Sequence, residues 1–117
     1  MPQRRYPRTA RLGRLLQEIV AEELERVASK DESLPLVTVT HVDVEADMHH
    51  ATVLLSSLDD VTAEALEVHR PRLQAAIARQ TRLKRTPQLF FRADPAVSSG
   101  SRVEEILREL RTGNDDD

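Results

Sequence analysis

The chain of 117 residues contains no cysteine and no tryptophan. The absence of cysteine excludes a thiol nucleophile, a CxxC redox centre and a zinc site built from thiolates. Apolar residues occur only in short runs, as at 34–39, so we expect neither a membrane-spanning segment nor a signal peptide. A chain of this length can bury a core of moderate size without metal or disulfide support, so we expect one globular domain in the cytoplasm.

Aromatic residues and glycines are also scarce, with one tyrosine, two phenylalanines and three glycines. Three aromatic residues are too few for a surface that stacks several bases, so any RNA recognition is expected to depend on phosphate contacts and shape. The chain has no glycine-rich phosphate loop, and residues 98–101 lack the GxSxG order of a nucleophile elbow. We therefore expect no enzymatic activity, no cofactor and no small-molecule substrate.

A metal site is a weak candidate, although histidine and carboxylate side chains are common metal ligands. No two histidines have the i, i+4 spacing that places two ligands on one helix face, and residues of hairpin turns are usually solvated. We therefore expect no metal site. The residues considered are His41, Asp43, Asp47, His49, His50 and His69.

The net charge of −3 conceals two basic segments. Residues 1–14 contain five arginines and no acid, and residues 69–92 contain seven basic residues and no acid. Together they hold twelve of the seventeen basic side chains, so the rest of the chain is acidic. If the two segments meet on one surface, that surface would neutralise phosphates while the acidic remainder keeps the protein off other polyanions. The alternative is an ordinary solvated face.

Hydrophobic periodicity predicts a helix followed by a hairpin in the first half of the chain. Apolar residues recur at steps of three and four over residues 7–29, which predicts an amphipathic helix with Pro7 in its first turn. Alternating apolar residues predict strands over 36–46 and 51–56, paired as an antiparallel hairpin. The apolar phase slips by one within the first strand, which predicts a bulge near Thr40 and His41.

The second half predicts helix, strand and helix. The helical pattern over 61–83 is interrupted by Pro71, which lacks an N–H and whose ring clashes with the preceding turn, so we expect two helices or one sharp kink. Residues 87–94 predict a third strand, in which one of the adjacent Phe90 and Phe91 faces the core and the other faces outward. Residues 101–112 predict a final helix that begins at a capping box.

This order gives an α+β layer in which a three-stranded sheet carries helices on one face. It is the order of a type II KH domain, an RNA-binding fold, extended by a C-terminal helix. KH domains clamp nucleotides with a GxxG loop between paired helices, and that loop is missing because the three glycines are isolated. We expect a single KH-like domain over residues 1–112 and a short, flexible acidic tail over 113–117.

Short motifs follow one another along almost the whole chain. Lys30 and Asp31 follow the first predicted helix, Val-Thr-Val-Thr occupies 37–40, and Arg-Leu-Lys-Arg-Thr-Pro occupies 82–87. Further matching positions are Asp47, Ala51, Val53, Ser56, Leu89, Phe91, Asp94, Gly100, Arg102 and Val103. In this order and spacing the motifs resemble the ribosome-binding factor A family, which has a KH-like fold without GxxG, over about residues 4–110.

The resemblance implies a non-enzymatic assembly factor that binds the free 30S small subunit and 16S rRNA late in maturation. It also implies help with 5′-end processing of the 16S precursor and a role in the cold. We expect a monomer that contacts rRNA phosphates through its two basic segments. The predicted RNA-binding residues are Arg4, Arg5, Arg8, Arg11, Arg70, Arg72, Arg79, Arg82, Lys84 and Arg85.

The chain also departs from the family pattern. After Asp31 the family has Pro-Arg, and this chain has Glu32 and Ser33. The family marks the interhelix kink with Ala-x-Gly, and this chain has His-Arg-Pro at 69–71. Two other functions stay open: a protein-protein adaptor whose arginines meet an acidic partner, and a small hydrolase with an unrecognised site.

Overall fold

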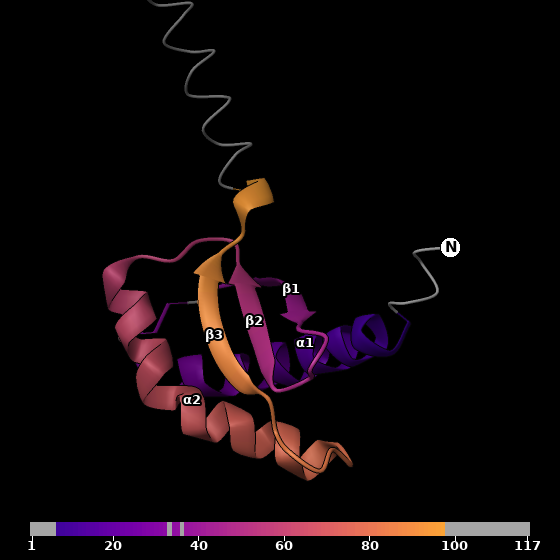
Figure 1. Cartoon of the computed structure of the whole chain (residues 1–117). Coiled ribbons are helices and arrows are strands. Elements are labelled where there is room, and N and C mark those ends of the chain that lie inside the picture. Colours follow the sequence, from indigo (N-terminus) through magenta and orange to yellow (C-terminus); the bar gives the residue numbers. More distant parts are fainter. Residues whose placement is uncertain (1–6, 33, 36, 98–117) are drawn as a thin grey trace, which may run out of the picture.

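The structure is a computed structural model, which describes residues 7–32, 34–35 and 37–97. The predicted final helix and tail, over 101–112 and 113–117, lie outside the described residues. None of the described helices is long and apolar enough to cross a membrane. The elements in chain order are α1 (Pro7–Ala28), β1 (Val39–Val44), β2 (His50–Leu55), α2 (Asp60–Gln80) and β3 (Gln88–Ala93), drawn in Figure 1.

The three strands form one sheet in the order β1-β2-β3. β1 and β2 are antiparallel, whereas β2 and β3 are parallel. The register of β1 against β2 shifts between Val39 and His41, which confirms the predicted bulge. β1 covers only the central part of the strand predicted over 36–46.

A tight turn ends β1 early. The backbone N–H of Glu45 donates to the carbonyl of His50 at 3.0 Å, and the backbone N–H of Met48 donates to the carbonyl of Glu45 at 2.8 Å. Met48 has a φ of 62°, and the N–H of His49 donates to the side chain of Asp47 at 2.8 Å. The bonds close the hairpin and give the Asp47 carboxylate a backbone donor, which lowers the pKa of that carboxyl.

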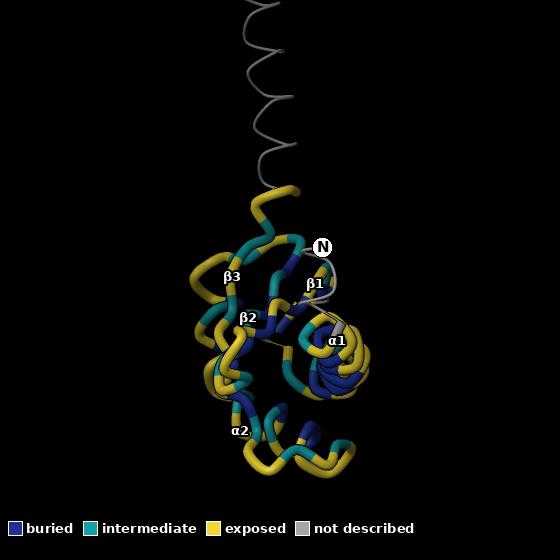
Figure 2. Tube along the Cα trace, turned by 45° about the vertical axis from the view of Figure 1, so that its right-hand side comes forward, coloured by how far each residue is buried: buried dark blue, intermediate teal, exposed yellow. Residues whose placement is uncertain are grey.

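Helices α1 and α2 lie on one face of the sheet, and no described helix covers the other face in Figure 1. Figure 2 shows the buried residues gathered on the inner sides of α1 and the strands. Burial of each apolar side chain contributes roughly 1.5–3 kcal/mol as an upper estimate, so the stripe of α1 is a large part of the core. The stripe agrees with the predicted periodicity and consists of Leu12, Leu16, Ile19, Val20, Leu24 and Val27.

Gly13 allows α1 to pack directly on the backbone of β1. A Cβ atom at this position would lie 2.6 Å from the carbonyl oxygen of Val42, which is closer than side chains come to a carbonyl. One turn later, Gln17 Nε2 donates to the carbonyl of Thr40 at 3.4 Å. Helix α1 thus covers β1 both by packing and by a hydrogen bond to its backbone.

Helix α2 begins at the N-cap Asp59, whose carboxylate accepts the N–H of Thr62 at 2.7 Å. It continues unbroken through Pro71, and in Figure 1 it changes direction about midway along its length. Of the two predicted arrangements, the structure therefore has one kinked helix. The helix ends before residue 83 because the C-cap Thr81 has an extended backbone, with φ of −127° and ψ of 166°. The N–H and hydroxyl of Thr81 both donate to the carbonyl of Ile77, at 3.0 and 2.9 Å, and satisfy that carbonyl at the helix end.

Strand β3 lies beside α2 and alternates as predicted. Leu89 is fully buried, Phe91 packs partly against the core, and Phe90 faces outward with 38% of its surface exposed. The Oε1 atom of Gln74 accepts the backbone N–H of Leu89 at 3.0 Å. The side of β3 that does not pair with β2 is therefore bonded to a side chain of α2.

Candidate nucleic-acid interface

The two basic segments belong to helix ends that lie on the same side of the molecule. The first segment enters the described structure at the amino end of α1, and the second includes the carboxyl end of α2 and the loop 81–87. In Figure 1 these two ends lie toward the right of the molecule, with the end of α2 below α1. Arg4 and Arg5 lie outside the described residues.

The cations at the carboxyl end of α2 point into solvent. Leu73 and Ile77 are fully buried on the inner side of α2, so Arg79 lies on its outer side. Arg82, Lys84 and Arg85 follow in the loop, and all four cations are exposed. Among the described residues, no carboxylate forms an ion pair with any of them. Their N–H donors are available to an external anion such as a phosphate.

The beginning of α1 has the same character. Arg8, Arg11 and Arg14 are exposed, and the first turn of the helix contains no acid. The ion pairs of the described chain leave these three arginines without a carboxylate partner. Because its first turn contains arginine and no acid, this helix end carries an excess of positive charge, which favours an anionic ligand there.

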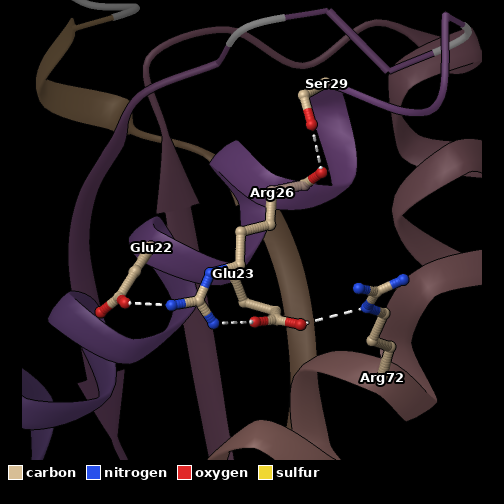
Figure 3. Close-up of polar contacts among 5 residues, drawn as sticks. All are labelled: Glu22, Glu23, Arg26, Ser29 and Arg72. Atoms are coloured by element: carbon tan, nitrogen blue, oxygen red, sulfur yellow. Dashed lines mark hydrogen bonds and ion pairs between the residues drawn. The ribbon is translucent and has the colours of Figure 1, made fainter.

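Arg72 was predicted to bind RNA together with Arg79 and Arg82, but it has a partner within the protein. Its Nε donates to Glu23 Oε1 of α1 at 3.0 Å, because the kinked α2 passes beside α1 at this point. Figure 3 shows the pair continuing through Arg26, which donates to Glu23 at 3.3 Å and to Glu22 at 2.6 Å. Arg72 therefore helps to join the two helices.

Glu23 is the buried centre of this network, with 4% of its surface exposed. The hydrogen bond from Arg72 is the main cause that holds the pKa of the Glu23 carboxyl below its ordinary value of 4.5, and Arg26 adds to it while burial opposes both. The sequence contains a signal for this residue, since Glu23 occupies an i, i+4 step from Ile19 and an i+3 step from Val20. A glutamate on the apolar stripe requires a cation, but the sequence does not show which one supplies it.

Arg70 also has an internal partner. Its Nη2 forms an ion pair with Glu67 on the same helix, and its Nε is buried with no hydrogen-bond partner among the described residues. The guanidinium carbon lies 6.0 Å from the ring centroid of Phe90 on β3. Arg70 thus points toward the sheet, away from the four cations at the carboxyl end of α2.

His69 joins the loop after α1 to α2 immediately before the bend. Its Nε2 lies 2.6 Å from the Asp31 carboxylate, and both side chains are partly buried. Asp31 is one of the motif residues from which the family resemblance was inferred. Its observed contact is structural, because it fixes the residues around Pro71 against the end of α1.

Of the residues considered as metal ligands, His69 is not part of the group of possible ligands found among the described residues. That group consists of Glu45, Asp47 and His50 at the hairpin turn, whose potential ligand atoms lie within 4.8 Å of one another. The Nδ1 atom of His50 lies 3.6 Å from the Glu45 carboxylate and 3.5 Å from that of Asp47. All three side chains are at least 40% exposed, and exposed acidic groups commonly lie this close together without a metal ion.

The sequence profile described as ribosome-binding factor A matches residues 8–107. The chain belongs to this family. The ribosome-binding factor A of Rubrobacter xylanophilus is 41% identical over 114 residues, which cover 94% of this chain and 92% of the relative. This degree of similarity confirms the resemblance inferred from the short motifs.

Solved structures of the ribosome-binding factor A family share the fold. The crystal structure of the Thermus thermophilus protein is 32% identical and has a TM-score of 0.65, over 73% of this chain and 94% of that protein. Coordinates of the same Thermus protein, fitted into a cryo-EM map of a 30S–RbfA complex, have a TM-score of 0.58 over 70% of this chain and 90% of that protein. The exposed cations at the amino end of α1, at the carboxyl end of α2 and in the loop 81–87 are therefore carried by a ribosome-binding factor A fold.

Proposed function

We propose that this chain is a non-catalytic assembly factor that binds the free 30S subunit during late maturation, in the cytoplasm. It contacts 16S rRNA by charge and shape. Six of the predicted RNA-binding cations are exposed, pair with no carboxylate among the described residues, and belong to two segments whose helix ends lie on one side of the molecule; this is the observation that supports the proposal. They are Arg8, Arg11, Arg79, Arg82, Lys84 and Arg85. Family membership supports the same conclusion, since the Thermus relative was fitted into a map of a 30S complex.

Arg4 and Arg5 extend the same basic segment along the chain, and we include them in the proposed contact surface. Arg70 and Arg72 were predicted to belong to it, but each forms an ion pair within the protein, so we assign them a smaller share of the binding energy. Each phosphate contact made by the other cations releases a counterion on binding. The affinity should therefore fall steeply with salt.

Co-sedimentation with purified 30S subunits at several salt concentrations tests the proposal. Eight phosphate contacts, those of Arg4 and Arg5 included, predict a slope of log K against log salt of about −6 to −7. Replacement of Arg79 and Arg82 by alanine should reduce the magnitude of that slope by about 1.4–1.8 and leave the thermal melt unchanged. Arg72→Ala is the matched control on the same helix. Because Arg72 is paired with Glu23, this variant should melt earlier but keep nearly the full salt slope.

The double charge reversal Arg79→Glu with Arg82→Glu should abolish binding to 30S while the protein stays folded. Association that hardly responds to salt would contradict the electrostatic mechanism. Binding to complete 70S ribosomes as strongly as to 30S would contradict an assembly role, and binding to neither would favour the adaptor alternative.

Help with 5′-end processing is a separate part of the proposal, and mapping the 5′ end of 16S rRNA in cells that lack the protein tests it.

A further inference from the structure

The open face of the sheet carries a site that the basic segments do not account for. Because side chains alternate along a strand, this face displays every second residue of β2 and β3, and none of the described helices covers it in Figure 1. The register pairs Thr52 with Phe90 and Leu54 with Arg92 across the two strands. A hollow of about 230 Å³ lies here, lined by Glu45, His50, Thr52, Phe90 and Arg92.

Phe90 is the phenylalanine of this hollow, and its ring is partly exposed to solvent between the side chains of His50 and Arg70. Its ring lies 5.7 Å from the His50 ring, tilted by 35°, and the Arg70 guanidinium lies 6.0 Å from its centroid. The ion pair with Glu67 holds Arg70 at this edge. The fold does not need an outward phenylalanine, because Leu89 and Phe91 supply the apolar contacts of β3 to the core.

We propose that this hollow binds one unpaired base of an RNA strand, stacked on Phe90. An aromatic ring flanked by histidine and arginine is the environment in which proteins hold a splayed-out base. Thr52 and Glu45 supply a hydroxyl and a carboxylate, which accept hydrogen bonds from amino groups on the base edge. The volume is below the 300–1,000 Å³ or so that is usual for sites of drug-sized ligands, so it suits one base and not a large ligand.

The carboxylate of Glu45 distinguishes a base from a phosphate as the occupant. A phosphate in the hollow would meet like charge from Glu45, whereas the amino group of adenine is a donor that this carboxylate accepts. Arg92 is exposed, and no carboxylate of the described chain pairs with it, so it is available to the phosphate that follows the bound base.

The position of the hollow relative to the basic loop favours RNA over a peptide as the partner. His50 pairs with Gln88 at the start of both strands, and Gln88 comes three residues after Arg85. An RNA strand whose phosphates bind Lys84 and Arg85 can therefore continue from the loop onto the beginning of β3. The inference rests on the proposed RNA contact and adds a preference for single strands, which the basic surface alone does not give.

Binding of fluorescently labelled decaadenylate and of a ten-base-pair RNA duplex, measured by anisotropy at equal salt, tests the inference. Phe90→Ala should weaken decaadenylate binding by about 5- to 150-fold, because stacking on an aromatic ring contributes this much per base. The same variant should change duplex binding by less than about twofold. Phe90→Tyr keeps an aromatic face and should bind decaadenylate like the wild type.

Controls separate this inference from the proposed function and from misfolding. If Phe90→Ala melts earlier than the wild type, Phe90→Leu keeps the apolar volume, and it should show the same selective loss. Arg79→Glu with Arg82→Glu should weaken both RNAs. Equal effects of Phe90→Ala on single strand and duplex, or no effect on either, would overturn the inference while 30S binding still supports the proposed function. If the wild-type protein binds neither 30S subunits nor either of the two RNAs, both the proposed function and this inference are overturned.

Discussion

Replacement of Gly13 by alanine tests whether α1 lies on the backbone of β1 as described. In a solvated helix this change stabilises by up to about 1 kcal/mol, because alanine has the higher helix propensity. Here the new Cβ would lie 2.6 Å from the Val42 carbonyl oxygen, so α1 must shift by at least about 0.4 Å to restore a contact that proteins tolerate. Helix α1 cannot shift freely, because its apolar stripe is packed into the core.

Overpacking of a core contact costs about 1–3 kcal/mol, which exceeds the gain in propensity. We expect Gly13→Ala to lower stability by about 1–2 kcal/mol, which corresponds to a Tm decrease of about 4–10 °C in a domain of this size. Circular dichroism melts with urea titrations measure both quantities. Ala10→Gly, an exposed site one turn earlier, is the matched control and should lose about 0.5–1 kcal/mol from propensity alone. A higher Tm for Gly13→Ala would refute the packing argument.

Two further predictions concern side chains that join α2 to its neighbours. Arg72→Ala should lower stability at pH 7 by about 1 kcal/mol, because Glu23 loses its strongest partner while Arg26 remains. Folding lowers the pKa of Glu23, so the ionised carboxylate contributes to stability above about pH 4.5, and this contribution is lost as the pH falls below that value. Urea titrations should therefore show a larger stability difference between the wild type and Arg72→Ala at pH 7 than at pH 4. Gln74→Ala should remove the partner of the Leu89 N–H and cost about 1 kcal/mol. Hydrogen exchange should then be faster at the Leu89 amide, and an unchanged exchange rate would show that another acceptor replaces Gln74.

The elements of the fold could be predicted because they depend on local periodicity. The stripe of α1 fixed both its type and its buried face, and the change of phase within β1 located the bulge between Val39 and His41. Pro71 predicted a break or a kink but did not decide between them. The choice depends on whether the turns on either side are packed well enough to continue the helix, and in this protein Leu66 and Leu73 are both fully buried.

The candidate site could be predicted only in part, because charge counts do not show which cations already have partners. Arg72 and Arg79 look equivalent in the sequence, yet Arg72 meets Glu23 across 49 residues of chain and Arg79 meets no described acid. That difference arises from the way α1 and α2 pass each other, which no local pattern contains. The alternation of β3 predicted that one of Phe90 and Phe91 faces outward, but it did not show which one. The contacts of Phe90 with His50 and Arg70 could not be predicted, because they depend on the pairing of β2 with β3 and on the position of α2.

The hydrogen bonds of Gln17 and Gln74 have a consequence for how the protein behaves in a crowded solution. A small sheet has two margins that could recruit a strand from another molecule, and such recruitment leads to aggregation. In this protein the helices that build the core also place an amide group on each outer strand, at Thr40 and at Leu89. We therefore expect core packing itself to lower the tendency of this sheet to pair with another molecule, while none of the described helices covers its broad face.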